Sequence, residues 1–181
     1  MKAYSIDPQT HSVEAINIHL EANTVYSFFN SILIDESQTL TKHAMYSDAN
    51  ALSEGKKPFF FGGQIIVGKL LIIGKEDFQD AEATIPQSEL ELLVDYNVNQ
   101  FYTDVLEALR QTDINLYRTF IVPKGAENIT LNIEWVLYTF NIADERTKEY
   151  FLTELNKAIE NNENIEEYMK KMATLAVKAA G

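Results

Sequence analysis

The first residues of the chain alternate between apolar and polar positions in a way that predicts short β-strands. Segments 2–6 and 13–18 show this alternation, and Asp7-Pro8-Gln9-Thr10 lies between them. A period of two is typical of a half-buried strand, and a proline-containing turn favours a hairpin. The sequence therefore predicts an antiparallel hairpin here.

A short helix and two more strands are predicted next. Asn23 is a favourable N-cap for a helix that ends near Ser31. Segments 32–34 and 40–46 have the composition of strands, and residues 47–50 are expected to form a loop.

The densest β signal lies in segment 59–74, where β-branched and aromatic residues are interrupted by glycines. This pattern predicts two buried strands with glycines at bulges or tight turns. The polar segment 75–82 is expected to be a loop, and it leads to a candidate boundary between lobes at Ile85-Pro86.

After Pro86 the period of the apolar residues changes from two towards 3.6, which indicates helices. One short helix follows Pro86, and a second carries an apolar stripe from Val98 to Leu109. The last forty residues predict two amphipathic helices, one beginning near Asp144-Glu145 and one from Ile165, separated by a break at Asn161-Asn162.

Segment 116–140 allows two interpretations. Residues 116–122 and 129–140 resemble strands joined through 123–128, which predicts a β-hairpin. The alternative is a helix in the second part, since Ile133, Val136, Leu137 and Phe140 would share one helical face.

Together these patterns predict an α+β fold, in which a small, mostly antiparallel sheet forms in the N-terminal half and helices of the C-terminal half pack on or beside it. The predicted organisation is a β-rich lobe at 1–85 and a helical lobe at 86–181, with the candidate hairpin at 116–140. One continuous domain is the alternative.

Charge and composition exclude several classes of function. The 181 residues include 15 Lys and Arg against 27 Asp and Glu, a formal charge of −12. Such a surface repels phosphate backbones and anionic lipids, so direct nucleic-acid or membrane binding is not expected.

The absence of cysteine excludes disulfides, Cys-ligated metals and thiol nucleophiles. The apolar runs are too short for a membrane span, and a cytoplasmic location is expected.

The pattern Gly63-x4-Gly68-Lys69 matches the beginning of a phosphate-binding P-loop. A P-loop needs a flexible loop before a helix and a Ser or Thr after the lysine. Here Gln64–Val67 favours a strand, and Leu70 follows the lysine. We therefore predict extended backbone at Gln64–Val67.

The remaining candidates for chemistry are weak. His11, His19 and His43 lack the spacing of metal ligands, and each is expected to be an ordinary surface or half-buried residue. Adjacent acidic residues point to different sides of the chain, whereas two-carboxylate catalysis needs carboxylates that face each other across a cleft. No catalytic residues, metal ligands or cofactor are predicted, and the chain is not expected to be an enzyme.

One aromatic run is a candidate binding patch. Phe59, Phe60 and Phe61 are consecutive, and alternate side chains of a strand point to opposite faces. Either both faces of this strand are covered, or part of the run remains at the surface and binds a partner.

The first 85 or so residues, just under half of the chain, resemble a family of small bacterial proteins of unknown function carried by phages, plasmids and conjugative elements. The resemblance rests on these segments: Met1-Lys2-Ala3-Tyr4-Ser5-Ile6-Asp7-Pro8, the helix with Tyr26, Phe60-Phe61-Gly62-Gly63, Gly68-Lys69-Leu70-Leu71-Ile72-Ile73-Gly74 and Ala83-Thr84-Ile85-Pro86. Glycine and hydrophobic spacings of this kind specify a fold more than an activity.

These observations favour a non-enzymatic acidic interaction protein of mobile-element origin that modulates a host protein. Its negative charge favours a basic partner, and self-association into a homo-oligomer is a second possible interaction. The alternative is a small-molecule or nucleotide-binding protein, or an enzyme with an unrecognised site.

Overall fold

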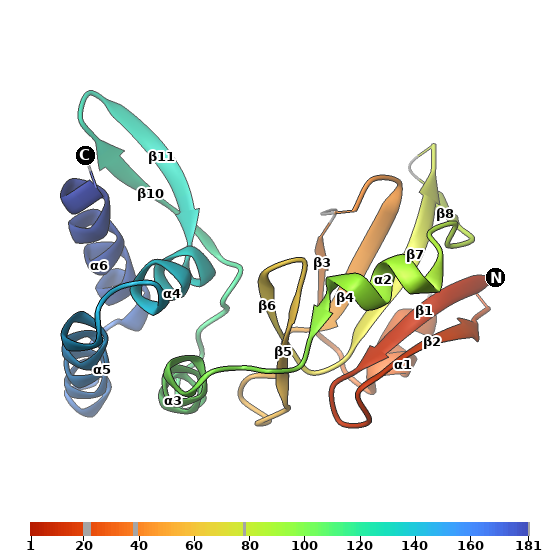
Figure 1. Cartoon of the computed structure of the whole chain (residues 1–181), viewed down its shortest axis with the longest axis horizontal. Helices are drawn as coiled ribbons and strands as arrows, with labels where there is room; N and C mark the ends of the chain where they lie inside the picture. The colour runs from red at the N-terminus through yellow and green to blue at the C-terminus, as the bar shows by residue number, and fades with distance from the viewer. Residues whose placement is uncertain (20–22, 38–39, 78, 181) are drawn as a thin grey trace. The chain divides into compact units, whose positions relative to one another are not determined.

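The computed structural model describes residues 1–19, 23–37, 40–77 and 79–180, and the chain divides into two compact units, Met1–Val98 and Asn99–Gly181 (Figure 1). The antiparallel sheet lies mostly in the N-terminal half and the helices mostly in the C-terminal half, which confirms the predicted α+β class. The division lies after the predicted boundary at Ile85-Pro86, so the helix that follows Pro86 belongs to the N-terminal unit.

The N-terminal unit contains two antiparallel sheets and two helices among its described residues. In chain order its elements are β1 (Lys2–Asp7), β2 (Ser12–Asn17), α1 (Thr24–Phe29), β3 (Ile34–Ser37), β4 (His43–Asp48), β5 (Pro58–Phe61), β6 (Gln64–Val67), β7 (Leu70–Glu76), β8 (Gln79–Ala81), α2 (Gln87–Leu93) and β9 (Val94–Asp95). The larger sheet has the order β2-β1-β7-β4-β3, with β8 paired to β7, and the smaller sheet has the order β6-β5-β9.

Strand β7 is the centre of the larger sheet, since it pairs with β1 on one side and β4 on the other. Its run Leu70–Ile73 is buried throughout, and a strand with an uninterrupted apolar run must be covered on both faces. On one face, Leu71 and Ile73 belong to a core cluster against which Phe28 and Phe29 of α1 pack. Figure 1 shows α2 crossing in front of this sheet.

The C-terminal unit combines one hairpin with four helices among its described residues. Its elements are α3 (Gln100–Leu109), β10 (Thr119–Lys124), β11 (Glu127–Asn132), α4 (Ile133–Asn141), α5 (Glu145–Glu160) and α6 (Ile165–Ala180). The β10–β11 hairpin packs along α6, and α4 contacts the three other helices. Aromatic rings fill the core, where Phe140 and Phe151 stack with 4.3 Å between ring centroids.

Several local predictions are confirmed. The N-terminal hairpin pairs Lys2 with Asn17 and Asp7 with Ser12. Helix α1 forms as expected, although the side chain of Asn23 makes no capping hydrogen bond. Helices α2, α3, α5 and α6 lie where the apolar stripes indicated.

The prediction of two strands in segment 59–74 is wrong, because the segment forms β6 and parts of β5 and β7, which lie in two different sheets. Gly62 and Gly63 both have positive φ, at 58° and 85°, and form the tight turn between β5 and β6. Glycine adopts this backbone without steric cost, so a whole hairpin fits where the pattern suggested one strand.

The strand predicted for residues 129–140 is also corrected. Strand β11 ends at Asn132, and the helical alternative is right for Ile133 onwards. The side chain of Asn132 accepts a hydrogen bond from the backbone N–H of Trp135 at 2.9 Å. This N-cap satisfies an otherwise unpaired donor of the first turn and starts α4.

Smaller differences occur around β3, β4, β7 and β8. Strand β3 begins only at Ile34 and β4 only at His43, whereas β4 continues into the predicted loop as far as Asp48. Segment 75–82, expected to be a loop, contains the end of β7 and all of β8, while its residue 78 lies outside the described residues. In the described ranges, no helix has the length and apolar character needed to cross a bilayer.

Candidate functional site

The three consecutive phenylalanines lie on alternate sides of β5. Phe59 and Phe61 are buried, at 0% and 3% exposure, whereas Phe60 is partly exposed. The alternation is that of a strand, and only Phe60 is available at the surface. A binding role for the run stays a prediction.

The glycine-lysine pattern does not form a phosphate loop. Gln64–Val67 is strand β6, as predicted, and its glycines lie in the turns before and after it. The amide of Gly68 donates to the carbonyl of Lys57, and the ammonium of Lys69 pairs with Asp7 at 3.0 Å. With Gln64–Val67 extended and the Gly68 amide bonded to Lys57, the segment forms no phosphate cradle.

The three histidines lie in different surroundings. His43 is buried, His19 is exposed, and His11 stacks on Tyr96 with 4.5 Å between ring centroids. Among the described residues, no three His, Asp or Glu side chains gather into a metal-binding group.

A cleft of about 370 Å³ in the N-terminal unit brings charged and aromatic side chains together. It lies where the turn after β1, the end of α1, the end of β4 and the turn before β7 converge. The side chains that carry its chemistry are Asp7, Phe28, Phe29, Asp48, Lys56 and Lys69. It includes the Gly68-Lys69 part of the pattern discussed above, in a different geometry.

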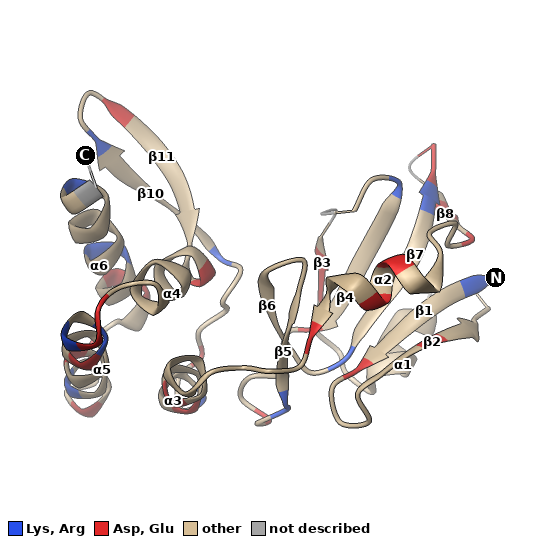
Figure 2. Cartoon of the chain, in the orientation of Figure 1, with Lys and Arg blue, Asp and Glu red and all other residues tan. Residues whose placement is uncertain are grey.

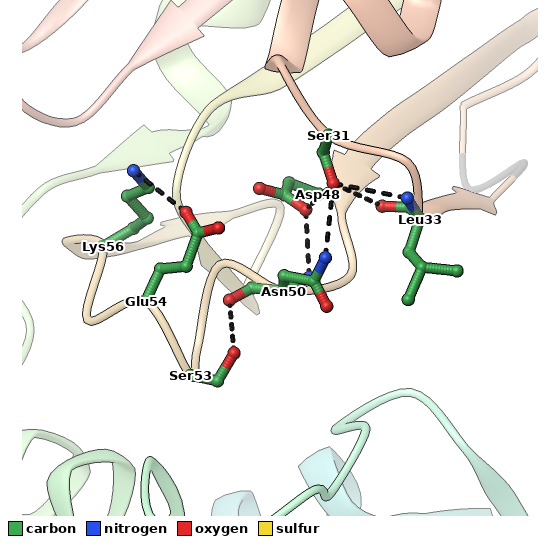
Figure 3. A network of polar contacts seen from close by, with 7 residues as sticks. All are labelled: Ser31, Leu33, Asp48, Asn50, Ser53, Glu54 and Lys56. Carbon is green, nitrogen blue, oxygen red and sulfur yellow. Dashed lines mark hydrogen bonds and ion pairs between the residues drawn. The ribbon is translucent and has the colours of Figure 1, made fainter.

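A network of polar contacts holds one wall of this cleft (Figure 3). The Oδ1 atom of Asp48 accepts hydrogen bonds from the hydroxyl of Ser31 at 2.7 Å and from the backbone N–H of Asn50 at 3.0 Å. The side-chain amide of Asn50 in turn donates a hydrogen bond to the Ser31 hydroxyl at 3.4 Å. The end of β4 is therefore tied to the segment after α1.

Another part of the cleft lining is held by the ion pair of Asp7 with Lys69 and by close backbone packing. Burial by itself would raise the pKa of Asp7, but hydrogen bonds from Lys69 and from the backbone of Gln9 outweigh this and lower it. Gly68 has φ of 80°, and a Cβ at this position would lie 2.9 Å from the Cβ of Ala51. Only glycine fits here without strain.

A second charged cluster spans β3, β4, β7 and β8. Lys75 pairs with Asp80 at 2.6 Å and with Glu36 at 3.4 Å, and its ammonium lies over the ring of Tyr46. Burial alone would lower the pKa of Lys75, but hydrogen bonds to Asp80 and Tyr46 raise it. A lysine held in its charged form by two carboxylates is suited to joining strands, not to proton transfer.

In the C-terminal unit, α4 carries apolar residues on two faces. Ile133, Val136, Leu137 and Phe140 are buried in the core. Trp135 and Tyr138 of α4 are followed by Ile142, the residue that caps the end of the helix, at spacing i, i+3 and i+7. These three residues form a stripe that we call the α4 outer stripe. Tyr138 is 52% exposed and Ile142 is 64% exposed, while Trp135 is partly buried.

Acidic residues flank the α4 outer stripe. Segment 133–145 contains Glu134, Asp144 and Glu145 but no Lys or Arg. Figure 2 shows the acidic positions near the start of α4 and in its connection to α5, with the middle of the helix uncharged. An apolar stripe between carboxylates complements an apolar surface with a basic rim.

Sequence reasoning missed both the cleft and the α4 outer stripe. The stripe has a signal, since helical spacing of Trp135, Tyr138 and Ile142 is visible once residues from Ile133 are taken as helix. The cleft has no such signal in the sequence, because its side chains come from separate segments between residues 7 and 69.

Comparisons of this chain with protein-family models, with curated proteins and with solved structures find no match.

Proposed function

We propose that the protein is a non-enzymatic acidic binding protein that engages a basic host protein through the α4 outer stripe. The observation that carries the proposal is the exposed apolar stripe on a helix whose opposite face already fills the core. A helix that is apolar on both faces is ordinarily buried on both, so the outward face lacks a partner within its own unit.

The types of residue in the stripe support protein binding. Tryptophan and tyrosine are enriched among the interface residues that carry most of the binding energy. Trp135 and Tyr138 also bring large, rigid surfaces that lose little conformational entropy when they bind.

The class of partner follows from charge and from the sequence resemblance. A chain with formal charge −12 attracts basic proteins, among them proteins that bind DNA. The resemblance of the N-terminal half to proteins of phages and plasmids favours a partner from the bacterial host. The proposal locates the encounter in the cytoplasm.

Affinity capture from a bacterial lysate with matched baits tests the proposal. The baits are the full-length protein, the double variant Tyr138→Ser and Ile142→Ser, and a control with Ile32→Ser and Leu92→Ser. The control residues are each 85% exposed and lie in the N-terminal unit, so the control also replaces two exposed large hydrophobic side chains but leaves the stripe intact. Circular dichroism checks that all three baits are folded.

We expect a basic protein to be captured equally by the full-length protein and the control, and at least about tenfold less by the stripe variant. Capture is expected to fall as salt is raised, because charge attraction is screened. The proposal fails if all three baits retain the same proteins, or if none retains a protein at low salt. It also fails if the stripe variant instead abolishes self-association in sedimentation experiments, which would make a second copy the partner.

A further inference from the structure

The cleft in the N-terminal unit has the features of a ligand site that is independent of the α4 outer stripe. Two cationic and two anionic side chains line it, namely Lys56, Lys69, Asp7 and Asp48. A wall of Phe28 and Phe29 completes it.

The balance of charge excludes a polyanion as the best ligand. Lys69 is already paired with Asp7 at 3.0 Å, and Lys56 is paired with Glu54 at 3.1 Å. Both lysine side chains are nevertheless 50% exposed, so their ammonium groups remain accessible. The Lys56–Glu54 pair is exposed on both sides and contributes little stability, so an incoming carboxylate can share the ammonium of Lys56 at small cost. The same carboxylate can bind the exposed side of the Lys69 ammonium while Lys69 keeps its contact with Asp7.

Asp48 offers a complementary acceptor for a positive group. Its Oδ1 atom is occupied by Ser31 and Asn50, whereas Oδ2 has no hydrogen-bond or ion-pair partner among the described residues. Figure 3 shows this second oxygen turned away from Ser31 and Asn50, on the side where Glu54 and Lys56 lie. A carboxylate oxygen of a half-buried aspartate favours an ammonium donor.

The apolar part of the cleft comes from the end of α1. Phe28 and Phe29 pack edge to face with 4.8 Å between ring centroids, and both line the cleft. Both side chains are half-buried, so part of each remains accessible to a ligand. Such a wall favours a ligand with an apolar or aromatic group.

We infer that this cleft binds a small zwitterion with an apolar side group, of the class of the free aromatic amino acids. The carboxylate of the ligand lies near Lys56 and Lys69, its ammonium donates to Asp48 Oδ2, and its side group packs on Phe28 and Phe29. The network around Ser31 and the close packing of Gly68 on Ala51 hold the cleft in place before binding.

Titration of the full-length protein, followed by amide chemical shifts, tests the inference. The probes are phenylalanine, phenethylamine, 3-phenylpropionate and inorganic pyrophosphate, which present both charges, the ammonium alone, the carboxylate alone and a polyanion. We expect phenylalanine to shift amides that line the cleft, among them those of Asn30 and Gly68, with a dissociation constant of about 1 mM. The two singly charged probes are expected to bind about tenfold more weakly.

Matched variants separate the cleft from general effects of charge. Asp48→Asn and Lys69→Gln are each expected to weaken phenylalanine binding about tenfold. The controls are Asp77→Asn and Lys57→Gln, at exposed positions that do not line the cleft, and they are expected to leave phenylalanine binding unchanged.

Three results would overturn the inference. Pyrophosphate could shift the cleft amides more strongly than phenylalanine, phenylalanine could shift none of them, or the control variants could weaken binding as much as the cleft variants. The comparison of probes uses the unmodified protein, so it remains decisive even where a variant misfolds. Because the α4 outer stripe lies in the other unit, failure of partner capture leaves this inference standing.

Discussion

The imidazole of His43 accepts a hydrogen bond from the backbone N–H of Thr84, with 3.2 Å between Nε2 and the amide nitrogen. The same Nε2 atom lies 3.3 Å from the amide nitrogen of Ile85, and Nδ1 lies 2.8 Å from the carbonyl oxygen of Thr41. Since Nε2 is an acceptor, Nδ1 carries the proton and donates to Thr41. The ring joins β4 to the segment after β8, and we interpret it as structural.

Replacement of this ring is expected to destabilise the N-terminal unit. His43→Leu leaves the N–H groups of Thr84 and Ile85 without their acceptor, which costs about 1–2 kcal/mol. Urea denaturation of the full chain measures this loss. His19→Leu, at an exposed position, is the control and is expected to change the unfolding free energy by less than about 0.5 kcal/mol. Equal effects of the two substitutions would argue against a structural role for His43.

Asp7 is expected to contribute stability that depends on pH. Its pKa in the folded protein is below the usual value of 3.8, because the contacts from Lys69 and Gln9 outweigh the effect of burial. The contribution is therefore present at neutral pH and is lost as pH falls through the lowered pKa.

Asp7→Asn tests this dependence. At neutral pH the variant is expected to be about 1 kcal/mol less stable than the natural chain, and the difference is expected to shrink as the pH approaches about 3. Urea denaturation at several pH values measures both. A constant difference across this range would show that the charge of Asp7 is not the cause. Glu76→Gln, at an exposed position, is the control.

Gly68 is expected to resist substitution more than a glycine of similar backbone. Gly63 and Gly68 have φ of 85° and 80°, but only at Gly68 would a Cβ meet another atom, the Cβ of Ala51 at 2.9 Å. Gly63→Ala therefore reports the cost of positive φ alone, about 1–2 kcal/mol. Gly68→Ala adds a steric clash and is expected to cost about 1–3 kcal/mol more. Equal losses in thermal or chemical unfolding would mean that the clash is relieved by a local shift.

Phe151 is expected to stabilise the C-terminal unit selectively. Its side chain is fully buried and contacts the rings of Phe101, Phe140 and Tyr168. Phe151→Ala removes these contacts and is expected to cost about 3–5 kcal/mol.

Hydrogen exchange distinguishes a local from a global effect of this substitution. Protection of α5 and α6 amides is expected to fall, while that of β7 amides in the N-terminal unit is retained, because each unit has its own core. Loss of protection in β7 to the same extent would show that the two units unfold as one. Tyr150→Ala, at an exposed position of the same helix, is the control.

Most elements could be predicted because their signals are local. The hairpin of β1 and β2, strand β6 and helices α5 and α6 depend on periodicity and on turn or cap residues a few positions away. The errors also have local causes. The pattern of segment 59–74 predicts too few strands, because the turn between β5 and β6 is only two glycines long and leaves no polar interruption in the sequence. Residues 129–140 fit both periods, and only the capping of α4 by Asn132 distinguishes them.

By itself, the sequence determined the α+β class, the strand at Gln64–Val67 that excludes a phosphate loop, and an acidic chain without cysteine. Only the tertiary structure decided that β5 and β7 belong to different sheets, that Lys69 pairs with Asp7, and which apolar residues of α4 remain exposed. The physical reason is the distance along the chain over which each effect acts. Backbone preference and periodicity act between neighbours along the chain, whereas clefts and exposed faces depend on contacts between residues that the topology brings together.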